Sequence, residues 1–287
     1  DGVNPNAIFV ALSKGYVVAS PGARGRVTKD SNGLYTGKAP AAIVDLKAAV
    51  RYLHYNDKVM PGSANRIVSN GTSAGGALSS LLGASGNNKD YDKYLKEIGA
   101  ANASDAVLVV SAYCPITNLE NADMAYEWLF NGINEYKSLK ITQSTDFKVE
   151  RTYVTGSMTE DQIKASNELK AMFPKYLNSL KLKDKKGNVL SLDSDGNGNF
   201  KDFVKSYIIA SAQKAMDKGT DLSQLTWITI NDNKVIDVDM NAYVSNMGRL
   251  KTTSAFDKFD LSSGENSLFG TSTIDTQHFT AYGQKNS

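Results

Sequence analysis

Residues 65–83 read NRIVSNGTSAGGALSSLLG, and this stretch decides the predicted fold. It begins with a partly apolar run over 65–70, passes through glycines on both sides of Ser73, and continues in small and apolar residues. The run predicts a buried strand, the glycines predict a turn, and the last part predicts a helix over 75–83. A serine at a strand-to-helix turn is a candidate nucleophile, because such a turn exposes the hydroxyl.

The same alternation of strand and helix extends to both sides of this stretch. Apolar runs at 16–20 and 105–112 predict two more buried strands, and Pro21-Gly22 closes the first of them. Between them, 39–55 has apolar residues at helical spacing, with Asp45, Lys47 and Arg51 on its polar side. Strands and helices that alternate in this way predict a parallel sheet with right-handed crossovers.

The pattern changes beyond Phe130, where few further runs resemble buried parallel strands. We therefore predict an α/β fold with three parts. Residues 1–130 form an α/β-hydrolase core with a partial parallel sheet, 131–250 form a large and mainly helical cap insertion, and 251–287 return toward the core. The elements predicted within the cap are a capping box at 157–160 before a helix that runs toward Leu180, a helix over 200–216, and a hairpin of 227–230 and 234–236 with a three-residue loop.

Composition excludes several classes of partner. The 287 residues include 41% hydrophobic ones, enough for a sizeable core. The 32 basic and 30 acidic residues are interspersed and leave a net charge of +2, so we expect no binding to nucleic acid or to a membrane. One cysteine excludes an internal disulfide. No apolar run approaches the ~18 residues that span a bilayer, so we expect a soluble chain. The sequence begins at Asp1 in what reads as a loop, from which we expect it to be part of a longer protein.

Ser73 is the candidate catalytic residue. An alcohol is a weak nucleophile at neutral pH, so it needs a base for its proton and backbone N-H groups for the oxyanion. The N-H of Ala74 is the predicted oxyanion donor, and Gly76 allows close packing of strand and helix. The alternative is a glycine-serine loop without chemistry.

The base and the acid are less clear in the sequence. The chain has two histidines. His54 precedes the serine and lies in a predicted helix, which favours a structural role. His278 follows the serine, as the base does in this class of fold, and Asp275 or an earlier carboxylate is a candidate to orient it. The preferred prediction places the acid and the histidine beyond Ser287, and the second oxyanion donor before Asp1.

Four segments carry a likeness to a known family. They are 15–25 (GYVVASPGARG), 45–53 (DLKAAVRYL), 71–76 (GTSAGG) and 113–117 (YCPIT). In them the chain resembles the bacterial tannases, or tannin acylhydrolases, of the α/β-hydrolase superfamily, and the likeness continues to the end of the chain. The resemblance implies a serine esterase that hydrolyses galloyl (phenolic acid) esters through an acyl-enzyme intermediate, with no required cofactor and a small phenolic ester as its binding partner.

The resemblance also implies a substrate site. Lys251 and Glu265 match the lysine and glutamate that grip the galloyl ring, and Ile116 matches an apolar residue on the ring face. Phenolic hydroxyls both donate and accept, so an ammonium and a carboxylate together can recognise them. Gly264 stands where the family has a stiffer residue, proline. The family's acid and histidine fall after the position of Ser287, which implies that this chain alone is inactive.

Other functions remain open at this point. The serine motif is shared with feruloyl esterases and general carboxylesterases, which do not need the lysine and glutamate pair. A different class is a hydrolase-fold binding module without catalysis. The compartment, bacterial cytoplasm or secretion, is open as well.

Two further features have a functional and a structural interpretation. Asp193, Asp195 and Asn197 match the first ligands of an EF-hand loop and are candidates for a structural calcium site, although Val204 stands where the bidentate glutamate belongs. A polar turn that caps the next helix explains the same residues. Cys114 follows a predicted buried strand, which favours a packed thiol over a nucleophile.

Overall fold

The computed structural model describes residues 6–143 and 149–286, so the loop expected at 1–5 lies outside the described residues. The chain divides into two compact units, each built from two segments. The first unit is Asp1–Asn118 with Asp260–Phe279, and the second is Leu119–Phe259 with Thr280–Ser287. The three-part division predicted from the sequence stays a prediction, because units defined by contacts need not coincide with an inserted domain.

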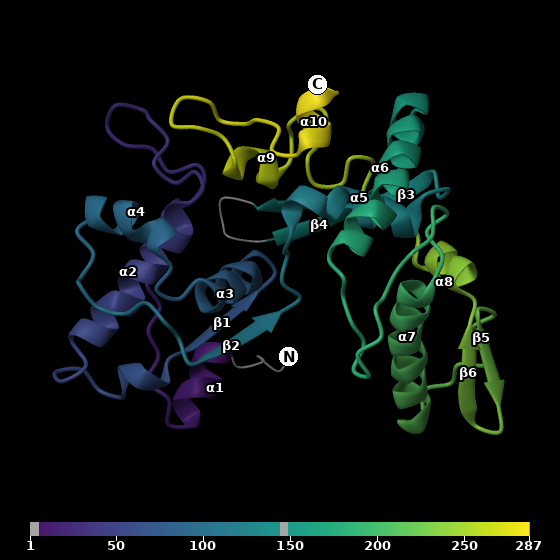
Figure 1. The fold of residues 1–287 in the computed structure, drawn as a ribbon, viewed down its shortest axis with the longest axis horizontal. Helices are drawn as coiled ribbons and strands as arrows, with labels where there is room; N and C mark the ends of the chain where they lie inside the picture. Colours follow the sequence, from purple (N-terminus) through teal and green to yellow (C-terminus); the bar gives the residue numbers. More distant parts are fainter. Residues whose placement is uncertain (1–5, 144–148, 287) are drawn as a thin grey trace. The chain divides into compact units, whose positions relative to one another are not determined.

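The first unit is of the α/β class (Figure 1). Its elements are α1 (Ala7–Ser13), α2 (Ala41–Tyr55), η1 (Ala64–Arg66), β1 (Val68–Thr72), α3 (Ala74–Ala84), η2 (Lys89–Tyr91), α4 (Asp92–Glu97), β2 (Val109–Tyr113) and α9 (Gly264–Leu268). β1 and β2 pair in parallel, with Val68 opposite Val109 and Thr72 opposite Tyr113. Both strands therefore end at the same edge, as predicted for strands joined by crossovers.

The core of the first unit lies between α2 and α3. Ile43 and Val50 of α2 pack with Leu82 of α3 in one buried cluster. The polar side of α2 differs from the prediction, because Lys47 is completely buried instead of facing water. Its ammonium donates to Asp105 Oδ1 at 2.9 Å, which compensates the burial of the charge.

The strand predicted at 16–20 is wrong. This segment is irregular, and the side chains of Tyr16 and Val17 are 61% and 57% exposed. An apolar run favours a strand, but a strand also needs a neighbour for its backbone groups. Among the described residues, none pairs with this segment in a sheet.

The second unit contains the remaining helices and two antiparallel hairpins (Figure 1). Its elements are α5 (Leu119–Phe130), β3 (Glu135–Gln143), β4 (Val149–Ser157), α6 (Glu160–Ser179), α7 (Asn199–Asp217), β5 (Ile228–Asn231), β6 (Lys234–Val238), α8 (Met240–Met247) and α10 (Ala281–Lys285). Met124 of α5 packs with Leu169, Phe173 and Leu177 of α6, and Trp128 packs against this cluster. Trp128 is thus a core residue, the more ordinary role for an aromatic at helical spacing.

Three details of the second unit differ from the prediction. The β3–β4 hairpin was not expected, because apolar residues of β3 such as Tyr136 and Leu139 fall on opposite faces of the strand and show no period of two. The N-cap of α6 is Thr159, paired with Gln162, and not Ser157 with Glu160. The loop between β5 and β6 has two residues, both with positive φ, because a two-residue turn of this kind matches the twist of the strands.

Within the described ranges, no helix has the length and apolar character needed to cross a membrane.

Candidate active site

Ser73 lies at the turn between the end of β1 and the start of α3. It is the N-cap of α3, with φ 59° and ψ −117°. A non-glycine residue rarely adopts a positive φ, and this strained turn is typical of the nucleophile elbow. Ser73 is exposed, and its side chain does not cap the helix. The hydroxyl is therefore presented to the surroundings and not consumed by the helix end.

The glycines around Ser73 are required by packing. A Cβ on Gly76 would lie 2.7 Å from the carbonyl oxygen of Tyr113 and 3.1 Å from Pro115 Cα. A Cβ on Gly71 would collide with the carbonyl of Gly75. Both glycines therefore allow α3 to lie directly against the ends of the two strands, as the motif predicts.

The end of β2 completes the turn. Ser73 N-H donates to Tyr113 O at 2.9 Å, and Ile116 N-H donates to Ser73 O at 3.3 Å. The backbone of Ile116, which the resemblance assigns to the ring face, is thus hydrogen-bonded directly to the serine. Between them, Cys114 is exposed and has φ 37°. The packed thiol predicted at Cys114 is wrong, because the tight turn after β2 directs this residue outward instead of continuing the strand.

Ala74 is the first residue of α3. The first N-H groups of a helix have no acceptor within it and carry the positive end of its dipole. Its role as the oxyanion donor stays a prediction, and this position is the one the role requires.

The two histidines have different surroundings. His54 lies in α2, and its Nε2 lies 3.1 Å from the carbonyl oxygen of Ala106, as expected for a structural histidine. His278 is half-buried in an irregular segment of the same unit as Ser73. The side chain of Asp275, the acid considered for it, accepts hydrogen bonds from Lys38 Nζ at 2.7 Å and Ser267 Oγ at 3.1 Å. The hydrogen bond from Lys38 holds the pKa of Asp275 below its usual value, and the role of His278 stays a prediction.

The two predicted ring-binding residues belong to different units. Lys251 is half-buried in the second unit, where its ammonium lies 4.5 Å from the ring centroid of Phe256. Glu265 is half-buried in the first turn of α9, in the first unit. A Cβ on Gly264 would meet the guanidinium of Arg26 at 3.4 Å. The assignment of Lys251 and Glu265 to the ring stays a prediction.

The candidate calcium loop is a polar turn in this structure. Asp193 Oδ1 accepts from the N-H groups of Asp195 and Asn197, both at 2.9 Å. Asn197 Oδ1 accepts from Lys201 Nζ at 3.0 Å. These bonds account for the side chains of Asp193 and Asn197 without an ion, and calcium binding stays a prediction.

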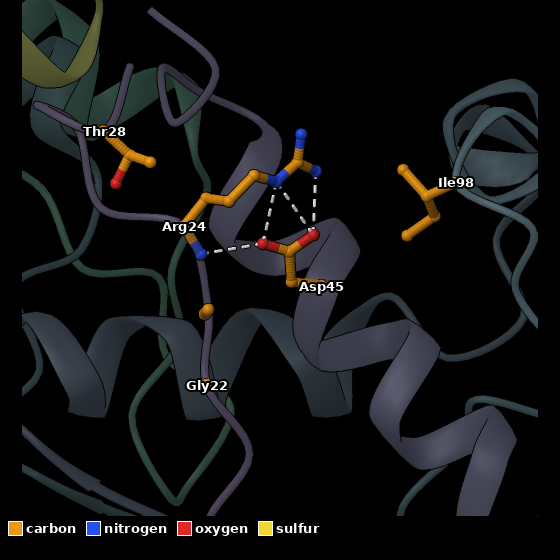
Figure 2. A pocket seen from close by; sticks show the side chains of 6 residues that line it. Gly22, Arg24, Thr28, Asp45 and Ile98 are labelled. Atoms are coloured by element: carbon orange, nitrogen blue, oxygen red, sulfur yellow. Dashed lines mark hydrogen bonds and ion pairs between the residues drawn. The ribbon is translucent and has the colours of Figure 1, made fainter. Parts of the chain in front are cut away.

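An ion pair that the sequence did not reveal joins two of the family-like segments (Figure 2). The guanidinium of Arg24 holds both carboxylate oxygens of Asp45, and Arg24 N-H donates to Oδ2 at 2.8 Å. Burial raises the pKa of Asp45, but the hydrogen bonds from Arg24 outweigh it and lower the pKa. The one signal in the sequence that could have predicted this ion pair is the presence of opposite charges, Arg24 and Asp45, in two family-like segments.

An open pocket of about 620 Å³ lies beside this ion pair. Its lining residues are Gly22, Ala23, Arg24, Thr28, Asp45 and Ile98. Ser73 is not among them, so we do not assign this pocket to the chemistry of the serine.

The geometry defines the class of protein. A strand that ends in an exposed serine at positive φ, a helix that starts there and a parallel neighbouring strand are part of an α/β-hydrolase fold. The chain belongs to the BD-FAE family, whose model matches residues 1–157.

Solved structures extend the likeness over the whole chain. The tannase of Fusobacterium nucleatum is 55% identical with a TM-score of 0.94 over 100% of this chain. The tannase of Lactobacillus plantarum is 47% identical with a TM-score of 0.94 over 98%. A tannin acyl hydrolase in complex with ethyl gallate is 48% identical with a TM-score of 0.91 over 98%. The resemblance to bacterial tannases is therefore confirmed.

The chain spans only part of these proteins, namely 63%, 60% and 59% of their respective lengths. No curated protein matches the sequence significantly.

Proposed function

We propose that the protein is a serine ester hydrolase that acts on esters of gallic or related phenolic acids. The observation that carries this proposal is the conformation of Ser73, exposed on a strained turn between β1 and α3. This is the arrangement that presents a nucleophilic hydroxyl beside the N-H groups of a helix start. Two of the family-like segments lie at this turn, because 71–76 forms it and 113–117 is hydrogen-bonded to Ser73.

The reaction follows the two-step acyl-transfer route. Ser73 Oγ attacks the ester carbonyl carbon while a histidine takes its proton, and the N-H of Ala74 donates to the oxyanion. The tetrahedral intermediate collapses, the alcohol leaves with the proton from the histidine, and the acyl group stays on Ser73. Water then attacks this acyl-enzyme by the same steps and releases the acid. The histidine is either His278 or, as the resemblance implies, one beyond the position of Ser287.

The preference for a phenolic acid rests on Lys251 and Glu265. An ammonium and a carboxylate can together pair with hydroxyls that donate and accept. A related hydrolase was solved with ethyl gallate, an ester of this kind. In our proposal Ile116, whose backbone is bonded to Ser73, packs against the ring face.

The test is hydrolysis of methyl gallate and methyl ferulate by the full-length protein. Ser73→Ala should reduce kcat on both esters by roughly 10⁴-fold or more, because it removes the nucleophile. Lys251→Ala should reduce kcat/KM on methyl gallate by about 10- to 100-fold, the range expected for a lost hydrogen bond to a charged group. Equal effects of Lys251→Ala on both esters would reject the galloyl preference and favour a feruloyl or general carboxylesterase.

Labelling with a fluorophosphonate separates an esterase from a binding module. The full-length protein should label at Ser73 within minutes, and Ser73→Ala should not label. If the wild-type protein does not label and hydrolyses neither ester, the hydrolase proposal is wrong.

A further inference from the structure

The second unit contains a fully buried ion pair that the proposed reaction does not use. Arg249 and Glu127 both have completely buried side chains. The guanidinium donates to the carboxylate through Nη2 at 2.6 Å and Nη1 at 2.9 Å, which is a bidentate geometry. Arg249 also donates to the carbonyls of Phe130 and Ile133. The pair therefore anchors the chain at residue 249 to α5 and to the segment that follows it.

The same anchor reaches the backbone of Lys251. Arg249 Nη1 donates to Lys251 O at 3.2 Å. On the other side of the residue, Lys251 N-H donates to Tyr126 Oη at 3.1 Å, and Leu250 N-H donates to the same oxygen at 3.1 Å. The N-H and the carbonyl of Lys251 are thus both held by side chains, although this segment is neither helix nor strand.

The side chain of Lys251 is held through α5 as well. Its ammonium lies 4.5 Å from the ring centroid of Phe256, a cation–π distance. Asp123 of α5 accepts the backbone N-H of Phe256 at 2.7 Å through Oδ1. One helix therefore positions the backbone of Lys251 through Tyr126 and the ring beneath its ammonium through Asp123.

We propose that Tyr126 is a positioning residue, which with the Arg249–Glu127 pair sets the location of the Lys251 ammonium and so determines selectivity for hydroxylated phenyl esters. This inference rests on the proposed function, in which Lys251 recognises the ring. A cation on a long and flexible side chain recognises hydroxyl positions only when its origin is fixed. Apolar residues of similar volume would stabilise the fold as well as this buried ion pair does. Positioning of Lys251 therefore gives the pair, and the tyrosine oxygen that accepts two hydrogen bonds, a role beyond stability.

The test uses Tyr126→Phe in the full-length protein. This change removes the acceptor oxygen and keeps the ring that stacks on Phe130 at 4.6 Å between centroids. We expect KM for methyl gallate to rise about tenfold, while kcat/KM for methyl benzoate, whose ring has no hydroxyls, stays within about twofold. The matched control is Tyr282→Phe, which removes a hydroxyl bonded to Glu168 in the same unit and should leave both esters unaffected.

A double-mutant cycle separates positioning from a general structural effect. If Tyr126 acts through Lys251, the double variant Tyr126→Phe/Lys251→Ala should be no worse on methyl gallate than Lys251→Ala alone. The inference would be overturned if the effects of the two substitutions on methyl gallate multiply in the double variant. It would also be overturned if Tyr126→Phe leaves the selectivity for methyl gallate unchanged. If Lys251→Ala keeps full selectivity for methyl gallate, the galloyl proposal fails and this inference fails with it. If Lys251→Ala loses that selectivity but Tyr126→Phe keeps it, only this inference fails.

A second variant covers the case that Tyr126→Phe does not fold, as judged by circular dichroism. Arg249→Lys keeps a positive charge opposite Glu127 but lacks the planar fork that reaches the carbonyl of Lys251. We expect Arg249→Lys to show the same rise in KM for methyl gallate as Tyr126→Phe. The double variant Arg249→Lys/Lys251→Ala should show no rise beyond that of Lys251→Ala alone. Unchanged selectivity in this variant would contradict the inference.

Discussion

At the scale of single residues, the turn at Ser73 depends on a missing side chain. The carbonyl oxygen of Tyr113 and the Cα of Pro115 both lie where a Cβ of Gly76 would contact them. These are backbone atoms, which cannot move aside by changing a rotamer. Gly75 is next to it in the same helix, and its Cβ position is open, with no atom within 4 Å.

We expect Gly76→Ala to lower the free energy of unfolding by about 1–3 kcal/mol, the usual cost of overpacking. The shift of α3 away from β2 should also lower the rate of fluorophosphonate labelling at Ser73. Urea denaturation followed by far-ultraviolet circular dichroism measures the first effect. Gly75→Ala is the control and should be neutral or stabilising by up to about 1 kcal/mol, because alanine favours a helix. Equal stability of the two variants would show that the close approach at Gly76 is unimportant.

At the scale of an element, α6 shows how a helix start is selected. Thr159 Oγ1 accepts the N-H of Gln162 at 3.2 Å, and Gln162 Oε1 accepts the N-H of Thr159 at 3.0 Å. Ser157, two residues earlier, is the last residue of β4 and donates to Glu135 at 2.7 Å instead. Both serine and threonine had a suitable spacing in the sequence, and the extent of the preceding strand decided between them.

Thr159→Ala should therefore cost about 1 kcal/mol of stability through the lost cap. Ser157→Ala should stay within about 0.5 kcal/mol, because its hydrogen bond is exposed. Thermal unfolding followed by tryptophan fluorescence is a suitable measurement, since the rings of Trp128 and Phe173 of α6 lie 5.2 Å apart. A larger loss in Ser157→Ala than in Thr159→Ala would contradict this assignment of the cap.

At the scale of the whole molecule, ion pairs join distant parts of the first unit. Arg24 binds Asp45, and Lys47 with Arg51 binds Asp105. Burial raises the pKa of Asp105, but hydrogen bonds from Lys47, from a backbone N-H and from Arg51 outweigh it, so the pKa is lowered. The pKa of Asp45 is lowered for the corresponding reason.

These lowered pKa values predict acid lability of the first unit. A carboxyl whose pKa is lower in the folded state stabilises the fold above its unfolded pKa of about 3.9. That stability is lost as the pH falls through the lower, folded pKa. Hydrogen exchange of peptides from α2, corrected for the intrinsic rate, should therefore show lost protection below about pH 4. Asp45→Asn, which leaves Arg24 partly exposed to water, should flatten this dependence, and an unchanged pH profile in that variant would contradict the explanation.

Much of the first unit could be predicted because its signals are local. The helix at α2, the strand at β1 and the turn at Ser73 each depend on residues a few positions apart. The strand expected at 16–20 failed because an apolar run indicates a strand only when a partner is present. In the second unit, the β3–β4 hairpin could not be predicted, because apolar residues such as Tyr136 and Leu139 fall on opposite faces of β3 and give no period of two.

The sequence by itself determined the strand-to-helix turn at Ser73, since glycine spacing, a preceding apolar run and a following small-residue helix all lie within about 19 positions. The tertiary structure alone decided which groups hold the charged residues. Arg249 meets Glu127 across 122 positions, and Lys251 meets Tyr126 across 125. Local patterns carry no information on such pairs, because burial of a charge is compensated only by a partner that folding brings to it.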